Sequence, residues 1–238
     1  GIIDVFIRNT PFLKNEIFIP DSYNFFNRVT YTKNLKRYDS FEKLKSKVGQ
    51  KVRWSVNYAL RNGLEVIVKK YSEINDNDIK LFYNLYTKVM DFRNTTDYYY
   101  FPENFFRDTF SVLKDKCDMF FIEKDGKFIA ASLFIKDSIV HYHFSATDRD
   151  YSKFQPMELL MLRAIYNYGN EGYKALHLGG GLSSDCSDGL SKFKKKFSDN
   201  ENKFFISKII CDPETYYNRR KKLVSENNNM FLIKDALI

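Results

Sequence analysis

His141 and His143 stand out because they alternate with Tyr142 in an apolar stretch of the chain. Alternate residues of a β-strand face the same side of a sheet, so the pattern predicts that the two imidazoles share one side and that Tyr142 faces the other. Either imidazole could accept a proton near neutral pH. His143 is therefore a candidate catalytic or substrate-contacting residue, with packing in the interior as the alternative. No third ligand has a recognisable metal spacing, so we expect no metal site.

Three consecutive glycines, Gly179, Gly180 and Gly181, follow a short apolar stretch. Glycine permits positive φ and close approach of the backbone, so this run could form the edge of a binding groove or could simply end a strand. The next segment contains Phe193 and four lysines, at positions 192, 194, 195 and 196. From their spacing alone, these lysines could be site residues or solvated surface charges.

An aromatic segment follows a polar turn that begins at Arg93. The phenol hydroxyls of Tyr98 and Tyr99 could line a groove for an acceptor, and the guanidinium of Arg93 could bind a phosphate. Closure of a hydrophobic core is the alternative for the tyrosines. Both interpretations predict that the segment connects two helices.

The chain has 238 residues and a formal net charge of +8. This charge favours a polyanionic partner such as tRNA, a nucleotide sugar, a coenzyme or anionic lipid, or else reflects a lysine-rich surface. Lys51, Arg53 and Arg61 lie on one predicted helix and could meet tRNA phosphates. Solvated surface charge is the alternative for these three cations as well.

Composition excludes several classes of protein. With 44% hydrophobic residues and only 5 Pro and 10 Gly, a disordered or collagen-like chain is excluded. No apolar run approaches the roughly 20 residues that span a bilayer. The first residues lack a basic region and a cleavage site, so we expect no signal peptide. The sequence also does not begin with Met, which is consistent with a processed chain or an excerpt. Three widely spaced cysteines form no disulfide framework, and we expect a cytoplasmic protein.

The pattern of apolar residues and breakers predicts an alternation of strands and helices. In the first part we expect strands at residues 4–8, 16–19 and 27–32, then one helix from an N-cap at Asp39 to Leu60, closed by Asn62-Gly63. The later elements are expected at 64–70 (strand), 76–93 and 102–113 (helices), 119–123, 128–135 and 138–145 (strands), 156–170 (helix), 174–178 (strand), 188–197 (helix), 204–210 (strand) and 213–223 (helix).

This order predicts a mixed α/β sheet flanked by helices, because an antiparallel meander is followed by a strand–helix–strand crossover. Ligands of such sheets bind where neighbouring strands diverge near a helix N-terminus. We expect that gap between residues 138–145 and 174–178, at the start of the helix at Pro156. The element order is that of the GNAT acyltransferase fold.

Several stretches resemble the FemABX-like branch of the GNAT superfamily. They are the basic helix and strand at 53–66, the helix and aromatic segment at 86–101, the turn Leu178-Gly179-Gly180-Gly181, the F-K-x-x-F helix at 188–197, and Asp212-Pro213-Glu214-Thr215-Tyr216. Members of this family attach amino acids from aminoacyl-tRNA to cell-wall peptides, or transfer other acyl groups to amines. The resemblance implies that Lys194, the lysine of the F-K motif, offsets charge at the donor end and is catalytic.

The resemblance covers roughly residues 40 to 220. Full-length family members contain two GNAT-like domains, which implies that residues 1–63 are part of a first domain and that residues 64–238 form the acyltransferase domain. Many acetyl-CoA-dependent members have a glycine-rich loop before the helix that receives the pyrophosphate. The corresponding segment here, residues 146–156, has no glycine, so acyl-CoA is a less favoured donor than aminoacyl-tRNA.

The sequence therefore predicts an N-acyl or aminoacyl transferase that acts on an amine of a peptidoglycan precursor or a related glycan. No tightly bound cofactor is expected, and a lipid-linked acceptor would bring the protein to a membrane surface. Two alternatives remain: a catalytically degenerate GNAT-like domain that binds nucleic acid or anionic glycan, and an acetyl-CoA-dependent N-acetyltransferase.

Overall fold

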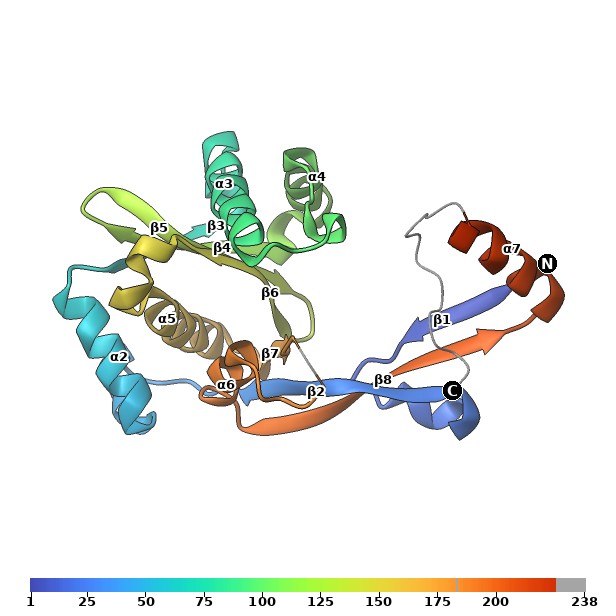
Figure 1. Ribbon diagram of the computed structural model, residues 1–238. Helices are drawn as coiled ribbons and strands as arrows, with labels where there is room; N and C mark the ends of the chain where they lie inside the picture. Colours follow the sequence, from blue (N-terminus) through green and yellow to red (C-terminus); the bar gives the residue numbers. More distant parts are fainter. Residues whose placement is uncertain (183, 226–238) are drawn as a thin grey trace. The chain divides into compact units, whose positions relative to one another are not determined.

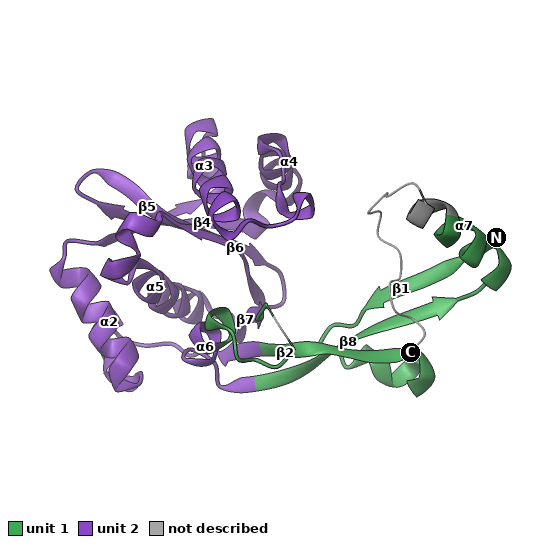
Figure 2. Cartoon of the chain, viewed as in Figure 1, with its two compact units in different colours: residues 1–30, 180–191, 201–238 green, residues 31–179, 192–200 purple. Residues whose placement is uncertain are grey.

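The computed structural model describes residues 1–182 and 184–225, with side chains up to residue 221 (Figure 1). The chain divides into two compact units (Figure 2). Unit 1 comprises residues 1–30, 180–191 and the part from 201 onward, and unit 2 comprises residues 31–179 and 192–200. Strand β2 (Asn24–Asn34), strand β8 (Asn200–Ile210) and helix α6 (Gly189–Lys195) contribute residues to both units.

Unit 1 is built on an antiparallel strand pair. Strand β1 pairs with β8, with Asp4 opposite Ile210 and Arg8 opposite Ile206. Helix α7 follows β8, and Asp212 begins it by accepting a hydrogen bond from the Thr215 N–H at 3.0 Å. The remaining elements of this unit are β1 (Asp4–Arg8), the 3₁₀ turns η1 (Asn15–Phe18) and η2 (Asp21–Tyr23), and α7 (Pro213–Ser225).

Unit 2 contains a mixed sheet in the order β7-β6-β5-β4-β3, with β2 next to β7. The strands are antiparallel from β3 to β6, and β6 and β7 are parallel. The hairpin between β4 and β5 turns at Asp125 and Gly126, which both have positive φ (50° and 75°), as an Asp-Gly turn favours. The bounds are β3 (Glu65–Lys70), β4 (Cys117–Lys124), β5 (Lys127–Lys136), β6 (Val140–Thr147) and β7 (Ala175–Gly180).

Helices cover both faces of this sheet (Figure 1). One face packs against α3 and α4, whose Phe82 and Phe106 meet Met119, Phe121 and Leu133 of the strands. The other face packs against α5, where the ring of Tyr168 contacts those of Phe120 and Phe134. Alternate residues of β4 thus enter two different cores, and each fully buried phenylalanine stabilises the fold by about 2–3 kcal/mol.

The helices of unit 2 are α1 (Phe41–Lys47), α2 (Gln50–Arg61), α3 (Asp76–Arg93), α4 (Glu103–Leu113) and α5 (Pro156–Glu171). The short 3₁₀ turns of the same unit are η3 (Tyr71–Glu73), η4 (Asp97–Tyr99), η5 (Lys114–Lys116) and η6 (Arg149–Phe154).

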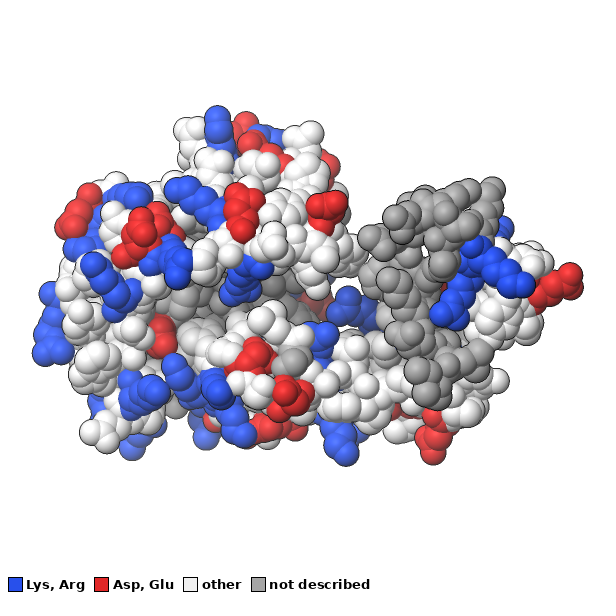
Figure 3. All heavy atoms as spheres, in the orientation of Figure 1, with Lys and Arg blue, Asp and Glu red and all other residues white. Residues whose placement is uncertain are grey.

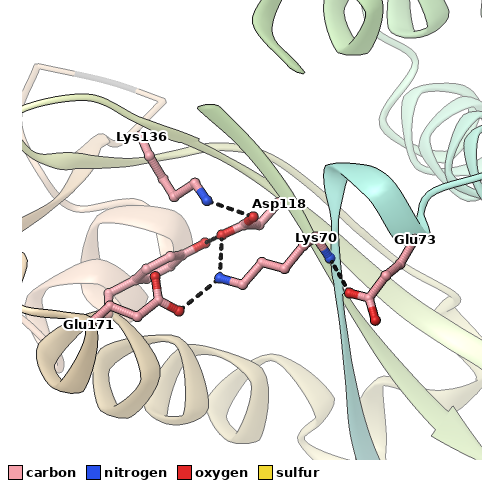
Figure 4. A network of polar contacts seen from close by, with 6 residues as sticks. Lys70, Glu73, Asp118, Lys136 and Glu171 are labelled. Carbon is pink, nitrogen blue, oxygen red and sulfur yellow. Dashed lines mark hydrogen bonds and ion pairs between the residues drawn. The ribbon is translucent and has the colours of Figure 1, made fainter. Parts of the chain in front are cut away.

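A buried carboxylate fixes α5 to the sheet (Figure 4). Asp118 of β4 is fully buried, and its two oxygens accept from Lys136 at 2.8 Å, Lys70 at 3.0 Å and the Tyr168 hydroxyl at 3.1 Å. Lys70 also pairs with Glu171 at the end of α5 at 2.7 Å. Burial lowers the pKa of Lys70, but the bonds to Glu171 and Asp118 outweigh it and the net shift is upward. The charges of this network are therefore matched within the fold.

Two predictions of secondary structure were wrong. The expected helix 39–60 is two helices, α1 and α2, because Val48 is extended and Gly49 is the N-cap of the second helix. The N-cap of α1 is Ser40 and not Asp39, because the Ser40 hydroxyl accepts a hydrogen bond from the Lys43 N–H. The expected strand at 16–19 is the 3₁₀ turn η1. The other predicted elements are confirmed, with ends that differ by at most four residues, and so is the mixed α/β fold class.

Candidate active site

Lys194 lies on α6, the helix that the F-K-x-x-F stretch predicted. Asp188 begins this helix by accepting hydrogen bonds from the N–H groups of Leu190 (2.9 Å) and Ser191 (3.0 Å). Phe197 just beyond the helix is buried, and its ring lies 5.3 Å from that of Phe193. These contacts orient the helix so that Lys194 points inward, and only 7% of it is exposed.

The Lys194 amine lies beside an aromatic ring and a glycine. Its Nζ is 5.8 Å from the centroid of the Tyr142 ring, which is within the range of a cation–π contact. Gly179 has φ +73°, and a Cβ at that position would stand 3.3 Å from the same Nζ. Glycine at position 179 therefore provides both the left-handed backbone and the space that the amine occupies.

Tyr142 reaches this side of the sheet because β6 carries a bulge. The pairing with β5 shifts between Leu133 and Phe134: Leu133 is opposite Phe144, and Phe134 is opposite Tyr142, which leaves His143 as an extra residue. Tyr142 packs beside Phe134 in the α5 core, whereas Phe144 packs in the core formed with α3 and α4. A bulge breaks the two-residue period. Tyr142 and Phe144 therefore lie on different sides of the sheet, where strict alternation would place them together, and the shared side of His141 and His143 stays a prediction.

A third histidine, His177 of β7, lies close to the same amine. It is opposite His141 in the parallel β6–β7 pair, and the two rings are 5.5 Å apart. Burial, then His141 and the positive charge of Lys194, lower the pKa of His177 to about 3. The imidazole therefore stays neutral at physiological pH. Lys194 is thus close to Tyr142 and acts electrostatically on His177.

The predicted gap between β6 and β7 begins at this point. Within the described residues the two strands pair only at Val140 with Leu176 and at His141 with His177. Helix α5 starts nearby in sequence at Pro156, after the 3₁₀ turn η6 and Gln155 in the left-handed conformation. Glu158 in the first turn of α5 pairs with Lys196 at 3.2 Å. This pair connects the start of α5 to the chain just after Lys194.

The phenol of Tyr142 stays protonated over a wide pH range. Burial raises its pKa to about 12, while Arg93 lowers it and Glu158 raises it. Arg93 also lowers the pKa of Tyr86, which burial raises to about 12. The guanidinium of Arg93 thus acts electrostatically on both phenols.

The other predicted site residues lie in different surroundings. His143 is exposed, with its ring 4.2 Å from that of Phe144. Tyr98 and Tyr99 are exposed on η4, where the Tyr99 carbonyl accepts from the Tyr86 hydroxyl at 2.9 Å. Their place in a substrate groove stays a prediction.

Gly180 and Gly181 belong to unit 1 and are needed for close packing. Neither has positive φ. A Cβ on Gly180 would stand 2.9 Å from the Val29 carbonyl oxygen, and one on Gly181 would overlap the Ser191 side chain. The Gly181 carbonyl accepts from Arg28 at 2.7 Å. The absence of a side chain at these two glycines leaves room for the Val29 carbonyl and the Ser191 side chain of unit 1. A role of these glycines in binding substrate stays a prediction.

The three predicted nucleic-acid-binding cations lie on α2. Lys51 and Arg61 are exposed, and Arg53 is half-buried, with Nη1 at 3.4 Å from the Ser46 carbonyl.

Two further findings concern membranes and metals. In residues 1–182 and 184–225, no helix is both long and apolar enough to cross a membrane. Over the same residues, no three His, Cys, Asp or Glu side chains gather to hold a metal ion.

The family model described as "Acetyltransferase (GNAT) domain" matches residues 50–195, which is more than half of the chain and includes β3 to β7 and Lys194. The chain belongs to this family. The predictions of a GNAT-type fold and of an acyltransferase are confirmed at this level. None of the curated proteins that were compared matches this GNAT chain.

Solved structures resemble the GNAT chain in fold at low sequence identity. FemX has 13% identity and a TM-score of 0.64, over 84% of this chain and 65% of FemX. The C-terminal domain of an Agrobacterium fabrum protein described as a lysylphosphatidylglycerol synthetase has 14% identity and a TM-score of 0.61, over 91% and 70%. L-PGS from Bacillus licheniformis has 13% identity and a TM-score of 0.56, over 77% and 60%. This chain thus spans about two thirds of the length of FemX, and the FemX-like fold agrees with the predicted branch of the superfamily.

Tyr142 and His177 were missing from the predicted site. The bulge that turns Tyr142 toward Lys194 has no sequence signal, because alternation continues through residues 140–146. His177 did have a signal, since it is a lone polar residue in an apolar strand two positions before Gly179. On a strand that spacing places it on the same side as Gly179.

Proposed function

We propose that this chain is an aminoacyltransferase that moves an amino acid from aminoacyl-tRNA to an amine of a cell-wall precursor. The observation that carries this proposal is the buried amine of Lys194, which is held between the Tyr142 ring and Gly179 beside the point where β6 and β7 separate. GNAT family membership supports acyl transfer in general. The donor and the acceptor are the new parts of the proposal.

The chemistry requires stabilisation of negative charge. The acceptor nitrogen attacks the carbonyl carbon of the aminoacyl ester, the C–N bond forms, and the C–O bond to the ribose breaks. The amine loses a proton, and the ribose oxygen gains one. Negative charge develops on the carbonyl oxygen during attack, and a positioned cation stabilises it most where water is excluded. Lys194 fits this role because it is buried and because its positive charge lowers the pKa of His177.

His177 fits a positioning role better than that of a base. A group whose pKa is about 3 binds a proton weakly at neutral pH. A neutral imidazole next to Lys194 adds no positive charge that would repel the ammonium. His143 stays a candidate base, because it is exposed on the bulge of β6.

The start of α5 supports RNA rather than acetyl-CoA as the source of the acyl group. A pyrophosphate at a helix N-terminus is held by free backbone N–H groups. Here the first residue of α5 is Pro156, which has no N–H, and the preceding segment is occupied by η6 and its side chains. The whole segment 146–156 lacks glycine. These features disfavour a close pyrophosphate cradle and favour a donor held elsewhere.

A transfer assay with separate donors and acceptors tests the proposal. The purified chain would be incubated with radiolabelled aminoacyl-tRNA or acetyl-CoA. The acceptors would be a soluble peptidoglycan precursor, a lipid-linked muropeptide and phosphatidylglycerol vesicles; the last is included because two similar structures are named for lysylphosphatidylglycerol synthesis. We expect label from aminoacyl-tRNA on a precursor amine. Label only from acetyl-CoA would replace the donor, label only on lipid would replace the acceptor, and no transfer from any donor would leave the degenerate binding domain.

A further inference from the structure

An aromatic and basic stripe runs along the exposed side of α2. Lys51, Trp54, Tyr58 and Arg61 follow one another at intervals of three, four and three residues, so they share one side of the helix. The rings of Trp54 and Tyr58 are stacked, with centroids 5.2 Å apart and planes 8° apart, and Trp54 is 56% exposed. We call these four residues the α2 stripe. The core-facing side of the helix is formed by Val52, Ser55, Val56 and Ala59.

The cations of the α2 stripe have no acidic partner on their own helix. Residues 50–61 include Lys51, Arg53 and Arg61 but no Asp or Glu. Among the ion pairs of the described residues, none includes Lys51 or Arg61. On α1, by contrast, Lys45 pairs with Glu42. Figure 3 shows Lys and Arg side chains on the part of unit 2 formed by α2. This positive, aromatic surface suits an anion that also has flat rings.

The C-terminal end of the stripe lies near the start of α5. The carbonyl of Asn62, the residue after Arg61, accepts from Lys124 at 3.0 Å. The same Lys124 Nζ is 5.3 Å from the ring of Phe154, which precedes α5 by two residues. The first turn of α5 pairs with Lys196 through Glu158. Within unit 2, a chain of contacts therefore runs from the α2 stripe to the residues beside Lys194.

We infer that the α2 stripe binds the single-stranded acceptor end of the donor RNA, with a base stacked on Trp54 and phosphates next to Lys51 and Arg61. This inference rests on the proposed function, which requires an aminoacyl-tRNA. Aromatic rings that take bases, beside cations that follow the backbone, are how proteins hold single strands. A membrane is disfavoured because an interfacial helix buries its apolar face in lipid, and the apolar face of α2 is already in the core.

Trp54 gives a direct measurement because it is the only tryptophan of the chain. The probe is an uncharged tRNA acceptor-stem hairpin that ends in single-stranded CCA, compared with the same hairpin without that end. We expect the CCA hairpin to quench the Trp54 fluorescence and the blunt hairpin to do so much less. Anisotropy of a labelled hairpin supplies the affinity for variants that lack the indole.

Variants separate the stacking from the charge. Trp54→Ala should weaken binding of the CCA hairpin by about 5- to 150-fold, because base–aromatic stacking contributes 1–3 kcal/mol per base. Tyr71→Ala, at another exposed aromatic ring on η3 (37% exposed against 56% for Trp54), should not. Lys51→Gln with Arg61→Gln should reduce the slope of log K against log salt by about 0.7 for each phosphate contact. Lys80→Gln with Lys88→Gln on α3 removes the same charge and should leave the slope nearly unchanged.

Three outcomes would overturn the inference. The first is equal quenching by the CCA and blunt hairpins, and the second is equal loss of affinity in the α2 and α3 double variants. The third is a blue shift of Trp54 with phosphatidylglycerol vesicles but no response to RNA, which would assign the stripe to a membrane surface. The proposed function is tested separately, because the hairpin carries no amino acid and reports on binding alone. Aminoacyl transfer without RNA binding at α2 would contradict only this inference. RNA binding at α2 without aminoacyl transfer would contradict only the proposed function.

Discussion

Two of the buried charged side chains of unit 2, Asp118 and Lys194, have very different surroundings. The Asp118 carboxylate is fully buried and accepts hydrogen bonds from two lysines and a tyrosine on three different elements. The Lys194 ammonium, 7% exposed, lies beside an aromatic ring, a glycine and a histidine that stays neutral. The first charge is matched by opposite charges of the fold. The second lies within cation–π range of the Tyr142 ring and acts electrostatically on His177.

The difference indicates what each charge does. A buried ion network is destabilising when one partner is removed, because the remaining charges stay in a medium of low polarity. Such a network holds strands and helices in register and has little left to offer a ligand. A buried cation close to the point where two strands separate can instead stabilise a negative charge that appears during a reaction. Substitutions can separate the two roles.

The largest effect on stability is expected at Asp118. Asp118→Asn keeps the size of the side chain but leaves Lys136, which is 11% exposed, without its anion. We expect the free energy of unfolding to fall by about 3–5 kcal/mol, measured by urea denaturation. Asp137→Asn is the matched control, because Asp137 and Lys116 form an exposed pair that contributes about 0–1 kcal/mol. Similar losses in both variants would contradict the structural role of the Asp118 network.

A smaller effect on stability, but a specific one on the site, is expected at Gly179. Gly179→Ala introduces a Cβ at φ +73° and 3.3 Å from the Lys194 Nζ. Gly63→Ala, at φ +74° with no atom within 4 Å of the new Cβ, carries the same backbone strain alone. We expect both to lose about 1–2 kcal/mol of stability, and only Gly179→Ala to lower aminoacyl transfer. If transfer falls equally in both, Gly179 does not position the amine.

The smallest effect at neutral pH is expected at His177. Its pKa is about 3 in the folded chain and near 6.5 when unfolded, so between these values the unfolded state binds more protons. The free energy of unfolding should therefore fall as pH drops from about 6.5 toward 3, by up to about 1.4 kcal/mol per pH unit from this group. In His177→Gln that part of the slope should vanish while stability at pH 7 changes little. An unchanged slope would show that His177 is not held neutral.

Most of the fold could be predicted from the sequence, because its local signals agree with its packing. The helix at 76–93 begins with Asn75 and Asp78 in a capping box, and the Asp125-Gly126 turn has the two positive φ angles that the dipeptide favours. The break between α1 and α2 was missed because Leu44, Val48, Val52 and Val56 keep helical spacing across it. The backbones of Val48 (ψ 159°) and Gly49 (ψ 152°) leave the helical region and interrupt the helix.

The candidate site could be predicted only in part. The position of Lys194 came from the resemblance of the F-K-x-x-F stretch, and the structure places that lysine beside Gly179, as the sequence neighbourhood indicated. Tyr142 could not be assigned, because the bulge at His143, which puts Tyr142 and Phe144 on different sides of the sheet, has no signal in the alternating sequence. The division into domains at residue 63, the cytoplasmic location and the partners stay predictions.

The most direct test of the account compares single-turnover aminoacyl transfer by the wild type, Lys194→Met and Lys192→Met. Lys192 is an exposed lysine on the same helix, so its variant controls for loss of charge, and circular dichroism confirms that all three proteins are folded. We predict that Lys194→Met slows transfer by about 10²–10³-fold, the usual effect of removing one oxyanion-stabilising group, while Lys192→Met remains close to wild type. Equal rates for the wild type and a folded Lys194→Met would contradict the central claim.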